Sequence, residues 1–214
     1  MLRVIDNFLD DPYLFRSTGL KLYNENKFVS TNFRWPGYRV EFPDSLLNQY
    51  IPKIATLGMI PEVESAVDSK LHCRTNFQWV DENWVSGMWH DDSSDYTVLT
   101  FLNLDAPSNT GIEIGNNIST SPTGSECLEY MIENNTKAKE SFYRSSRNYY
   151  QRYQFKKKLD KYNSSPYFKD PCVVSNKFNR TVIFNKSQLH RAQNFFGKGK
   201  DARFTLISFC DPTT

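Results

Sequence analysis

Three residues far apart in the chain have side chains suited to a metal site. His90 and Asp92 are separated by one residue, and His190 follows a hundred residues after His90. Because alternate residues of an extended strand point to the same face, a His-x-Asp pair presents an imidazole and a carboxylate side by side. A distant histidine can complete a two-histidine, one-carboxylate face. The adjacent Asp91 points to the opposite strand face and is the weaker candidate ligand.

This ligand set indicates a reaction type rather than a substrate. Two histidines and one carboxylate, with coordination positions left open, are the ligands of ferrous iron in non-haem oxygenases. Each residue alone also has an ordinary structural explanation. His72 lacks an Asp at the same spacing and is interpreted as a surface or hydrogen-bonded strand residue. The order, spacing and strand placement of all three residues together favour the metal site.

The elements that must position these residues are mostly strands. A central segment, 126–162, differs from them, because it has many charges, no Pro or Gly, and apolar residues at helical spacing. It predicts an inserted helix that acts as a lid or a contact element. Alternating patterns predict strands over 3–5, 71–80, 97–102, 181–184 and 203–209, and apolar periodicity predicts N-terminal helices over 11–25 and 45–57.

The order of these elements predicts the fold class. Strands on both sides of one long helical segment, with His and Arg at strand ends, fit a mainly β jelly roll, the cupin-like double-stranded β-helix. With 214 residues, the chain is long enough for one domain over 1–214 with a substantial core.

Composition and charge narrow the function classes. Hydrophobic residues make up 39% and charged residues 23%, and the net charge is +2, so bulk charge requires neither nucleic acid nor a membrane surface. We expect a cytoplasmic protein, because the N-terminus lacks the apolar run of a signal peptide and no 18-residue apolar segment occurs. We therefore expect reduced thiols at the four scattered cysteines, which are Cys73, Cys127, Cys172 and Cys210.

Several segments together carry a resemblance to a known family. They make the chain similar to the 2-oxoglutarate- and Fe(II)-dependent dioxygenases, particularly the prolyl-hydroxylase-like branch and its small phage-encoded relatives. The resemblance covers 71–210 apart from the insert, and 1–60 more weakly. The matching segments are WHDD (89–92), YTVLTFLN (96–103), TGIE (110–113), VIFN (182–185), LHRA (189–192) and RFTLISF (203–209).

The resemblance implies a role for each candidate residue. His90, Asp92 and His190 would be the catalytic iron ligands, and 2-oxoglutarate would chelate the iron from two open positions. Arg203 lies thirteen residues after His190, as the family's anchoring arginine does, and its planar fork suits the distal carboxylate. Thr205 shares its strand face and would support the same carboxylate.

Other contacts to 2-oxoglutarate remain open in the sequence. A tyrosine often helps to hold the cosubstrate in these hydroxylases, and Tyr96 is the nearest candidate. The family's double glycine corresponds here to Thr110-Gly111, so half of that signature is present. Arg191 competes with Arg203 as the anchor, although its neighbour His190 turns its side chain away from the metal. Polar residues on one face of the strand 71–80 are further candidates for holding 2-oxoglutarate: Arg74, Asn76 and Gln78.

The activity that the resemblance implies is oxidation of an organic substrate. We expect hydroxylation coupled to conversion of 2-oxoglutarate to succinate and carbon dioxide, with Fe(II) as the metal and ascorbate as a stimulant. The substrate would be a small molecule or a peptide, and the sequence leaves its identity and the oligomeric state open. The alternative is a catalytically silent jelly-roll binding module.

The inserted segment is the part that such a binding module would use. Residues 137–161 contain nine basic and two acidic residues with aromatics between them, a combination found in nucleic-acid grooves. We favour another interpretation, in which Phe142, Tyr149 and Tyr153 lie at helical spacing and face the barrel. The basic side chains would then form a solvated face, as charge runs on helices usually do.

Overall fold

A computed structural model describes all five predicted strands and both N-terminal helices. The insert predicted over 126–162 and the alternative ligand Asp91 lie outside the described residues. The residues described are 1–28, 37–56, 71–82, 87, 90, 92–115, 171–186 and 188–212.

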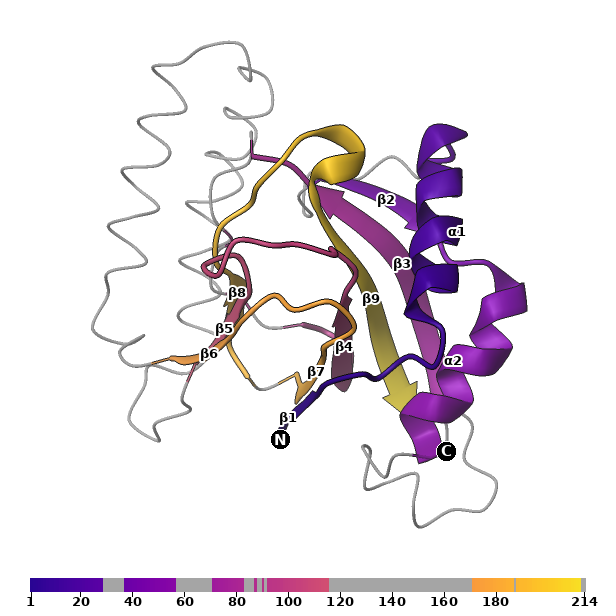
Figure 1. Cartoon of the computed structure of the whole chain (residues 1–214). Coiled ribbons are helices and arrows are strands. Elements are labelled where there is room, and N and C mark those ends of the chain that lie inside the picture. Colours follow the sequence, from indigo (N-terminus) through magenta and orange to yellow (C-terminus); the bar gives the residue numbers. More distant parts are fainter. Residues whose placement is uncertain are drawn as a thin grey trace.

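Two antiparallel sheets form the framework (Figure 1). Strands distant in sequence are neighbours in both, so the chain crosses between sheets as a jelly roll requires, and the predicted fold class is confirmed. The larger sheet has the order β1 (Leu2–Ile5), β7 (Thr181–Asn185), β4 (Tyr96–Phe101), β9 (Arg203–Pro212), β3 (Leu71–Val80) and β2 (Tyr38–Glu41). The smaller sheet has the order β6 (Cys172–Val174), β5 (Ile112–Ile114) and β8 (His190–Ala192).

The two N-terminal helices, α1 (Pro12–Asn24) and α2 (Asp44–Thr56), confirm the predicted helices within a residue or two. α1 begins after Asp11, whose carboxylate accepts a hydrogen bond from the Leu14 amide at 2.9 Å. It lies so close to the sheet that a Cβ atom on Gly19 would be 2.5 Å from Phe204 Cζ. No helix among the described residues is long and apolar enough to cross a membrane.

The larger sheet has a different apolar layer on each face. Helices cover one face, where Trp79 of β3 stacks on Phe204 of β9 with ring centroids 4.3 Å apart. The other face is turned toward the smaller sheet, and Phe184 and Ile207 belong to the apolar cluster on that side. We call these the helix face and the inner face. Because side chains alternate along a strand, every strand of this sheet contributes to both.

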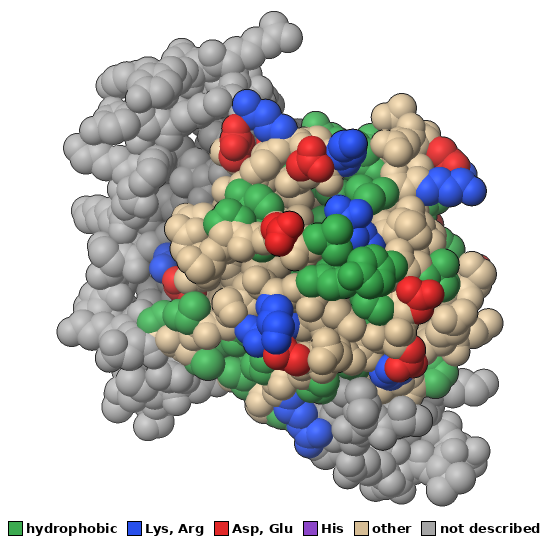
Figure 2. Space-filling view, viewed as in Figure 1, with side chains coloured by type: hydrophobic (Ala, Val, Ile, Leu, Met, Phe, Trp, Pro, Cys, Tyr) green, Lys and Arg blue, Asp and Glu red, His purple; other side chains and the backbone are tan. Residues whose placement is uncertain are grey.

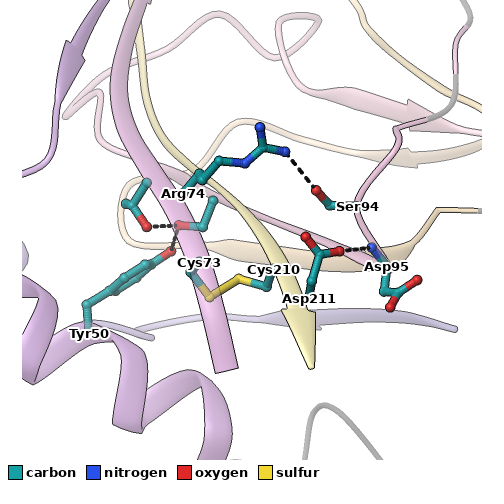
Figure 3. The surroundings of a disulfide bond; sticks show 9 residues. Tyr50, Cys73, Arg74, Ser94, Asp95, Cys210 and Asp211 are labelled. Atoms are coloured by element: carbon teal, nitrogen blue, oxygen red, sulfur yellow. Dashed lines mark hydrogen bonds between the residues drawn. A yellow bond between two sulfur atoms is a disulfide. The ribbon is translucent and has the colours of Figure 1, made fainter. Parts of the chain in front are cut away.

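A disulfide joins Cys73 of β3 to Cys210 of β9 on the helix face (Figure 3). The prediction of reduced thiols is therefore wrong for this pair. The two residues are 137 positions apart in sequence, but the β3–β9 register places them directly opposite each other. Antiparallel neighbours at such a position are close enough for their sulfur atoms to bond. Cys172 is an exposed free thiol, and Cys127 lies outside the described residues.

The surface charge is mixed on the face shown in Figure 2. Acidic and basic side chains alternate there with apolar and polar ones, and the described residues of this view form no extended area of one sign. This mixture agrees with the small net charge of +2.

Candidate metal centre

The backbone brings the two predicted histidine ligands together. His90 and His190 form an isolated antiparallel bridge, in which each amide donates to the other's carbonyl at 3.0 and 2.9 Å. Their imidazole centroids lie 4.3 Å apart. A segment just before β4 is thus fixed against β8 of the smaller sheet, which closes the hundred-residue separation in sequence.

Asp92 lies between these histidines and is buried. Its Oδ2 is 3.4 Å from His190 Nε2, and its Oδ1 is 3.9 Å from His90 Nε2. Thr97, at the start of β4, donates its hydroxyl to Oδ2 and so fixes the carboxylate. Oδ1 is buried and has no hydrogen-bond partner among the described residues. A buried carboxylate oxygen without a donor is costly unless a cation takes that position.

The environment of His190 favours the state that can bind a metal. Its Nδ1 is 3.0 Å from the Gln188 carbonyl, so a proton on Nδ1 leaves the Nε2 lone pair directed at the site. Burial, and secondarily the charge of His90, lowers the pKa of His190 to about 4. The imidazole is therefore neutral near pH 7. Its ring also packs on Phe184 at 4.4 Å.

The three side chains form a compact donor set. One ligand atom from each of His90, Asp92 and His190 lies within 4.8 Å of the others. Two nitrogens and one carboxylate oxygen on one side of a site are the facial arrangement that non-haem Fe(II) uses. The donor set and the orphaned Asp92 oxygen fit such a metal.

Arg203 and Thr205 lie on the inner face of β9, as the alternation predicted. Their neighbours Phe204 and Leu206 pack in the helix-side cluster, so Arg203 and Thr205 point the other way. Arg203 is 3% exposed, and its Nε donates to the Thr110 carbonyl at 3.2 Å. Burial lowers its pKa to about 10, which leaves the guanidinium charged at pH 7.

Two polar atoms of this pair lack partners. In the part of the chain that the structure describes, neither Arg203 Nη2 nor Thr205 Oγ1 has a hydrogen-bond partner, although both are buried. Buried donors without acceptors are rare in native proteins. A guanidinium and a hydroxyl side by side suit a carboxylate, so the residues fit the distal group of 2-oxoglutarate.

Two other candidate anchors are directed elsewhere. Arg191 donates its Nε to Glu113 on the neighbouring strand β5, which gives it an acidic partner of its own. Tyr96 belongs to the helix-side cluster, because it precedes Thr97, whose side chain is on the inner face. The structure therefore does not bring Tyr96 together with Arg203 and Thr205.

The register separates the polar candidates on β3. Gln78 is 5% exposed and lies directly opposite Thr205, so it is the candidate beside Thr205 and Arg203. Asn76 is half-buried opposite Ile207. Arg74 is exposed opposite Phe209, and its Nη2 donates to Ser94 at 3.3 Å (Figure 3).

The sequence did not identify every residue that supports the site. The hydroxyl of Thr97 holds Asp92, and the Gln188 carbonyl orients His190. Thr97 begins the strand predicted over 97–102, but its contact with Asp92 depends on the path of the loop between them. Arg39 of β2 was also missed; its guanidinium interacts electrostatically with Asp92.

Comparison with known proteins gives structural matches alone. No family model and no curated protein matches the sequence. A prolyl hydroxylase from Trichoplax adhaerens, solved with a hypoxia inducible factor peptide fragment, matches at 11% identity with a TM-score of 0.55, over 98% of this chain and 83% of that one. The 2-oxoglutarate-dependent epimerase SnoN of nogalamycin biosynthesis matches at 13% identity with a TM-score of 0.58, over 98% and 78%.

A third match has a metal and cosubstrate bound. HygX from Streptomyces hygroscopicus, solved with nickel and 2-oxoglutarate, is 13% identical with a TM-score of 0.53, over 99% of this chain and 83% of that one. Identities this low demonstrate the fold alone. The chain has the jelly-roll fold of the 2-oxoglutarate- and iron-dependent oxygenases, as its sequence resemblance implied.

Proposed function

We propose that the protein is a non-haem Fe(II)- and 2-oxoglutarate-dependent oxygenase that hydroxylates an organic substrate and releases succinate and carbon dioxide. The observation that carries the proposal is the compact donor set of His90, Asp92 and His190, with a buried Asp92 oxygen that has no partner among the described residues. When bound, iron and 2-oxoglutarate would supply the activation of dioxygen, which protein side chains cannot perform.

The protein's own residues would bind and orient these groups. His90, Asp92 and His190 would hold the metal from one side and leave the opposite side open. Arg203 would bind the distal carboxylate of 2-oxoglutarate with Nη2, and Thr205 would donate its hydroxyl to the same group. Gln78, opposite Thr205, would border this position. The apolar cluster that contains Phe184 and Ile207 would limit access of water.

For the substrate, the proposal names a broad class and not one compound. Solved proteins of this fold include one described with a peptide fragment and one described with hygromycin B, so the fold accommodates peptides and small molecules. We propose a substrate of either kind for this chain. Ascorbate would act as a stimulant by keeping the iron ferrous.

Metal binding tests the ligand assignment. Calorimetric titration should find one Mn(II) or Fe(II) bound per chain, and His90→Ala or His190→Ala should each abolish binding, because two ligands remain in either variant. His72→Ala is the matched control, since His72 is an exposed histidine on β3 that should leave binding unchanged. Parent-like binding by both ligand variants would show that the site is elsewhere.

Cosubstrate turnover then separates an enzyme from a silent binding module. With Fe(II), dioxygen and ascorbate, the protein should form succinate from 2-oxoglutarate slowly without substrate, and His190→Ala should stop it. Absence of 2-oxoglutarate binding to the metal-loaded protein under anaerobic conditions would favour the binding module.

A further inference from the structure

The inner face of the larger sheet carries two more arginines on the side of the metal centre. We propose that Arg39 and Arg74 bind an anionic group of the substrate, a carboxylate or a phosphate, beside the iron. The inference rests on the proposed function and deepens it, because it gives the substrate a chemical class.

Arg39 comes from the edge strand β2 and extends toward the metal ligands. Its neighbour Val40 packs in the helix-side cluster, so Arg39 is on the inner face, opposite Gln78 in the register. The guanidinium carbon lies 5.7 Å from the centroid of the Phe209 ring, which gives the cation an aromatic surface to rest on. From there it also interacts electrostatically with Asp92. Burial lowers the pKa of Arg39 to about 10, so it remains a cation at pH 7.

Arg74 approaches the same region from β3. Its backbone lies opposite Phe209, the residue whose ring carries the Arg39 guanidinium. Figure 3 shows its side chain extending away from the disulfide toward Ser94, whose hydroxyl accepts from Nη2. Ser94 is buried and lies two residues after Asp92. Arg74 thus contacts the segment that supplies the carboxylate ligand, and Arg39 interacts electrostatically with that ligand.

The formal charges of the proposed centre balance without Arg39 and Arg74. Ferrous iron, the Asp92 carboxylate, the two carboxylates of 2-oxoglutarate and the Arg203 guanidinium cancel one another. Among the described residues of β2, β3 and β9, two acidic residues share the inner face with Arg39 and Arg74. Asp211 accepts a hydrogen bond from the Asp95 amide at 2.8 Å, and Glu41 is exposed on the edge strand β2. Their formal charges offset those of Arg39 and Arg74, so the two arginines offer an anion paired hydrogen-bond donors near the Asp92 segment rather than a net positive surface.

Guanidinium groups suit this position for a chemical reason. Their planar donors bind the two oxygens of a carboxylate or phosphate in parallel, which fixes orientation as well as position. An anionic group held by Arg39 and Arg74 would place the adjoining carbon atoms of the substrate against the open side of the iron. Neutral analogues of the same shape would lose both the charge and the paired hydrogen bonds.

Saturation-transfer NMR with matched probes tests the inference. The protein is loaded with diamagnetic Zn(II) and saturating 2-oxoglutarate, and benzoate, phenyl phosphate and the neutral benzamide are added separately. Benzoate or phenyl phosphate should show transfer, and benzamide should show little. The tighter of the two anions identifies the carboxylate or the phosphate as the preferred group.

Variants assign the binding to the two arginines. Arg39→Gln and Arg74→Gln should each weaken the preferred anion by about tenfold, and Arg39→Lys should restore part of the loss. Lys21→Gln, which removes an exposed charge from α1 on the helix face, is the matched control and should bind as the parent does. Arg203→Ala lacks the proposed anchor for 2-oxoglutarate and should still bind the preferred anion. That result would exclude binding of the probe at the cosubstrate position.

The outcomes separate this inference from the proposed function. Equal transfer to benzamide and benzoate, or unchanged anion binding in both glutamine variants, would overturn the inference. Zn(II) and 2-oxoglutarate binding are measured by calorimetry on the same samples, and their absence would overturn the proposed function instead. If loading fails, the same NMR comparison is made on unloaded Arg203→Ala protein, which lacks the cosubstrate anchor, so each result is obtained independently.

Discussion

At the scale of single residues, the protonation state of His190 connects the site with the stability of the fold. Its imidazole is buried beside His90 and has a pKa of about 4, against an ordinary value of 6.5. Between these two pH values the unfolded chain takes up a proton that the folded chain does not. The contribution of His190 to the free energy of unfolding is therefore fully present above pH 6.5 and is lost as the pH falls toward 4.

Urea denaturation of the metal-free protein at a series of pH values checks this linkage. The free energy of unfolding should decline from pH 6.5 to 4, and His190→Gln should make the decline shallower because it removes the titrating group. His72→Gln, on the exposed part of β3, should keep the parent slope. Equal slopes for the parent and His190→Gln would contradict the burial argument.

Arg203 provides the second prediction at this scale. Arg203→Ala should weaken 2-oxoglutarate by at least about tenfold, since hydrogen bonds to charged groups contribute about 1.5–3 kcal/mol each. Mn(II) affinity should change little, because Arg203 is not a ligand. Arg203→Lys should rescue part of the loss, since a point charge cannot reproduce the planar fork.

Arg191→Ala is the matched control for this measurement. Arg191 is only one residue from His190 but pairs with Glu113, so its removal should leave 2-oxoglutarate affinity near that of the parent. Calorimetry on the Mn(II)-loaded protein measures both variants. A loss of affinity in Arg191→Ala together with retention in Arg203→Ala would reverse the assignment.

At the scale of elements, β9 is the strand that joins the core to the site. It pairs with β3 over its whole length and with β4 from Thr205 to Cys210, and alternation divides its side chains between two layers. Phe204 and Cys210 pack on the helix face, whereas Arg203 and Thr205 are directed to the inner face. A shift of one residue in its register would exchange these layers, so burial of the apolar set fixes the direction of Arg203.

The disulfide between β9 and β3 gives a prediction for this element. Reduction, or the double substitution Cys73→Ser and Cys210→Ser, should lower the free energy of unfolding by about 2–4 kcal/mol, as a native cross-link typically does. Urea denaturation with and without reductant measures the change. Cys172→Ser should respond to reductant as the parent does, because Cys172 is a free surface thiol. Identical curves in both conditions would contradict the cross-link.

At the scale of the whole molecule, the proposed metal would join the two sheets. His190 lies on β8 of the smaller sheet, and Asp92 precedes β4 of the larger one. Because His90 is bridged to His190, a metal bound by all three ligands would connect segments that are distant in sequence. Because the metal would bind the folded chain and not the unfolded one, it should stabilise the whole jelly roll.

Thermal unfolding with added ligands checks this coupling. Mn(II) should raise Tm, and 2-oxoglutarate should raise it further; a ligand at a hundred times its Kd adds about 2.7 kcal/mol. His190→Ala should lose the metal-dependent increase. Arg203→Ala should keep that increase and lose the second one. An unchanged Tm in the parent protein would argue against a metal site between the sheets.

The sequence by itself determined the features that depend on local periodicity. The period of two assigned Arg203 and Thr205 to one face of their strand, and the His-x-Asp spacing gave a candidate ligand pair. Capping and apolar spacing located α1 and α2 to within a residue or two. These properties follow from backbone geometry, which each short segment expresses without the rest of the chain.

Only the tertiary structure decided which distant segments meet. The β3–β9 register brought Cys73 opposite Cys210 and Gln78 opposite Thr205, and the bridge between His90 and His190 closed the donor set. Tyr96 lies on the helix face and not beside Arg203, whereas Arg39, which the sequence did not indicate, lies on the inner face, because the helices pack on one face of the sheet. Strand order is set by burial of apolar surface over the whole molecule, which no local pattern encodes.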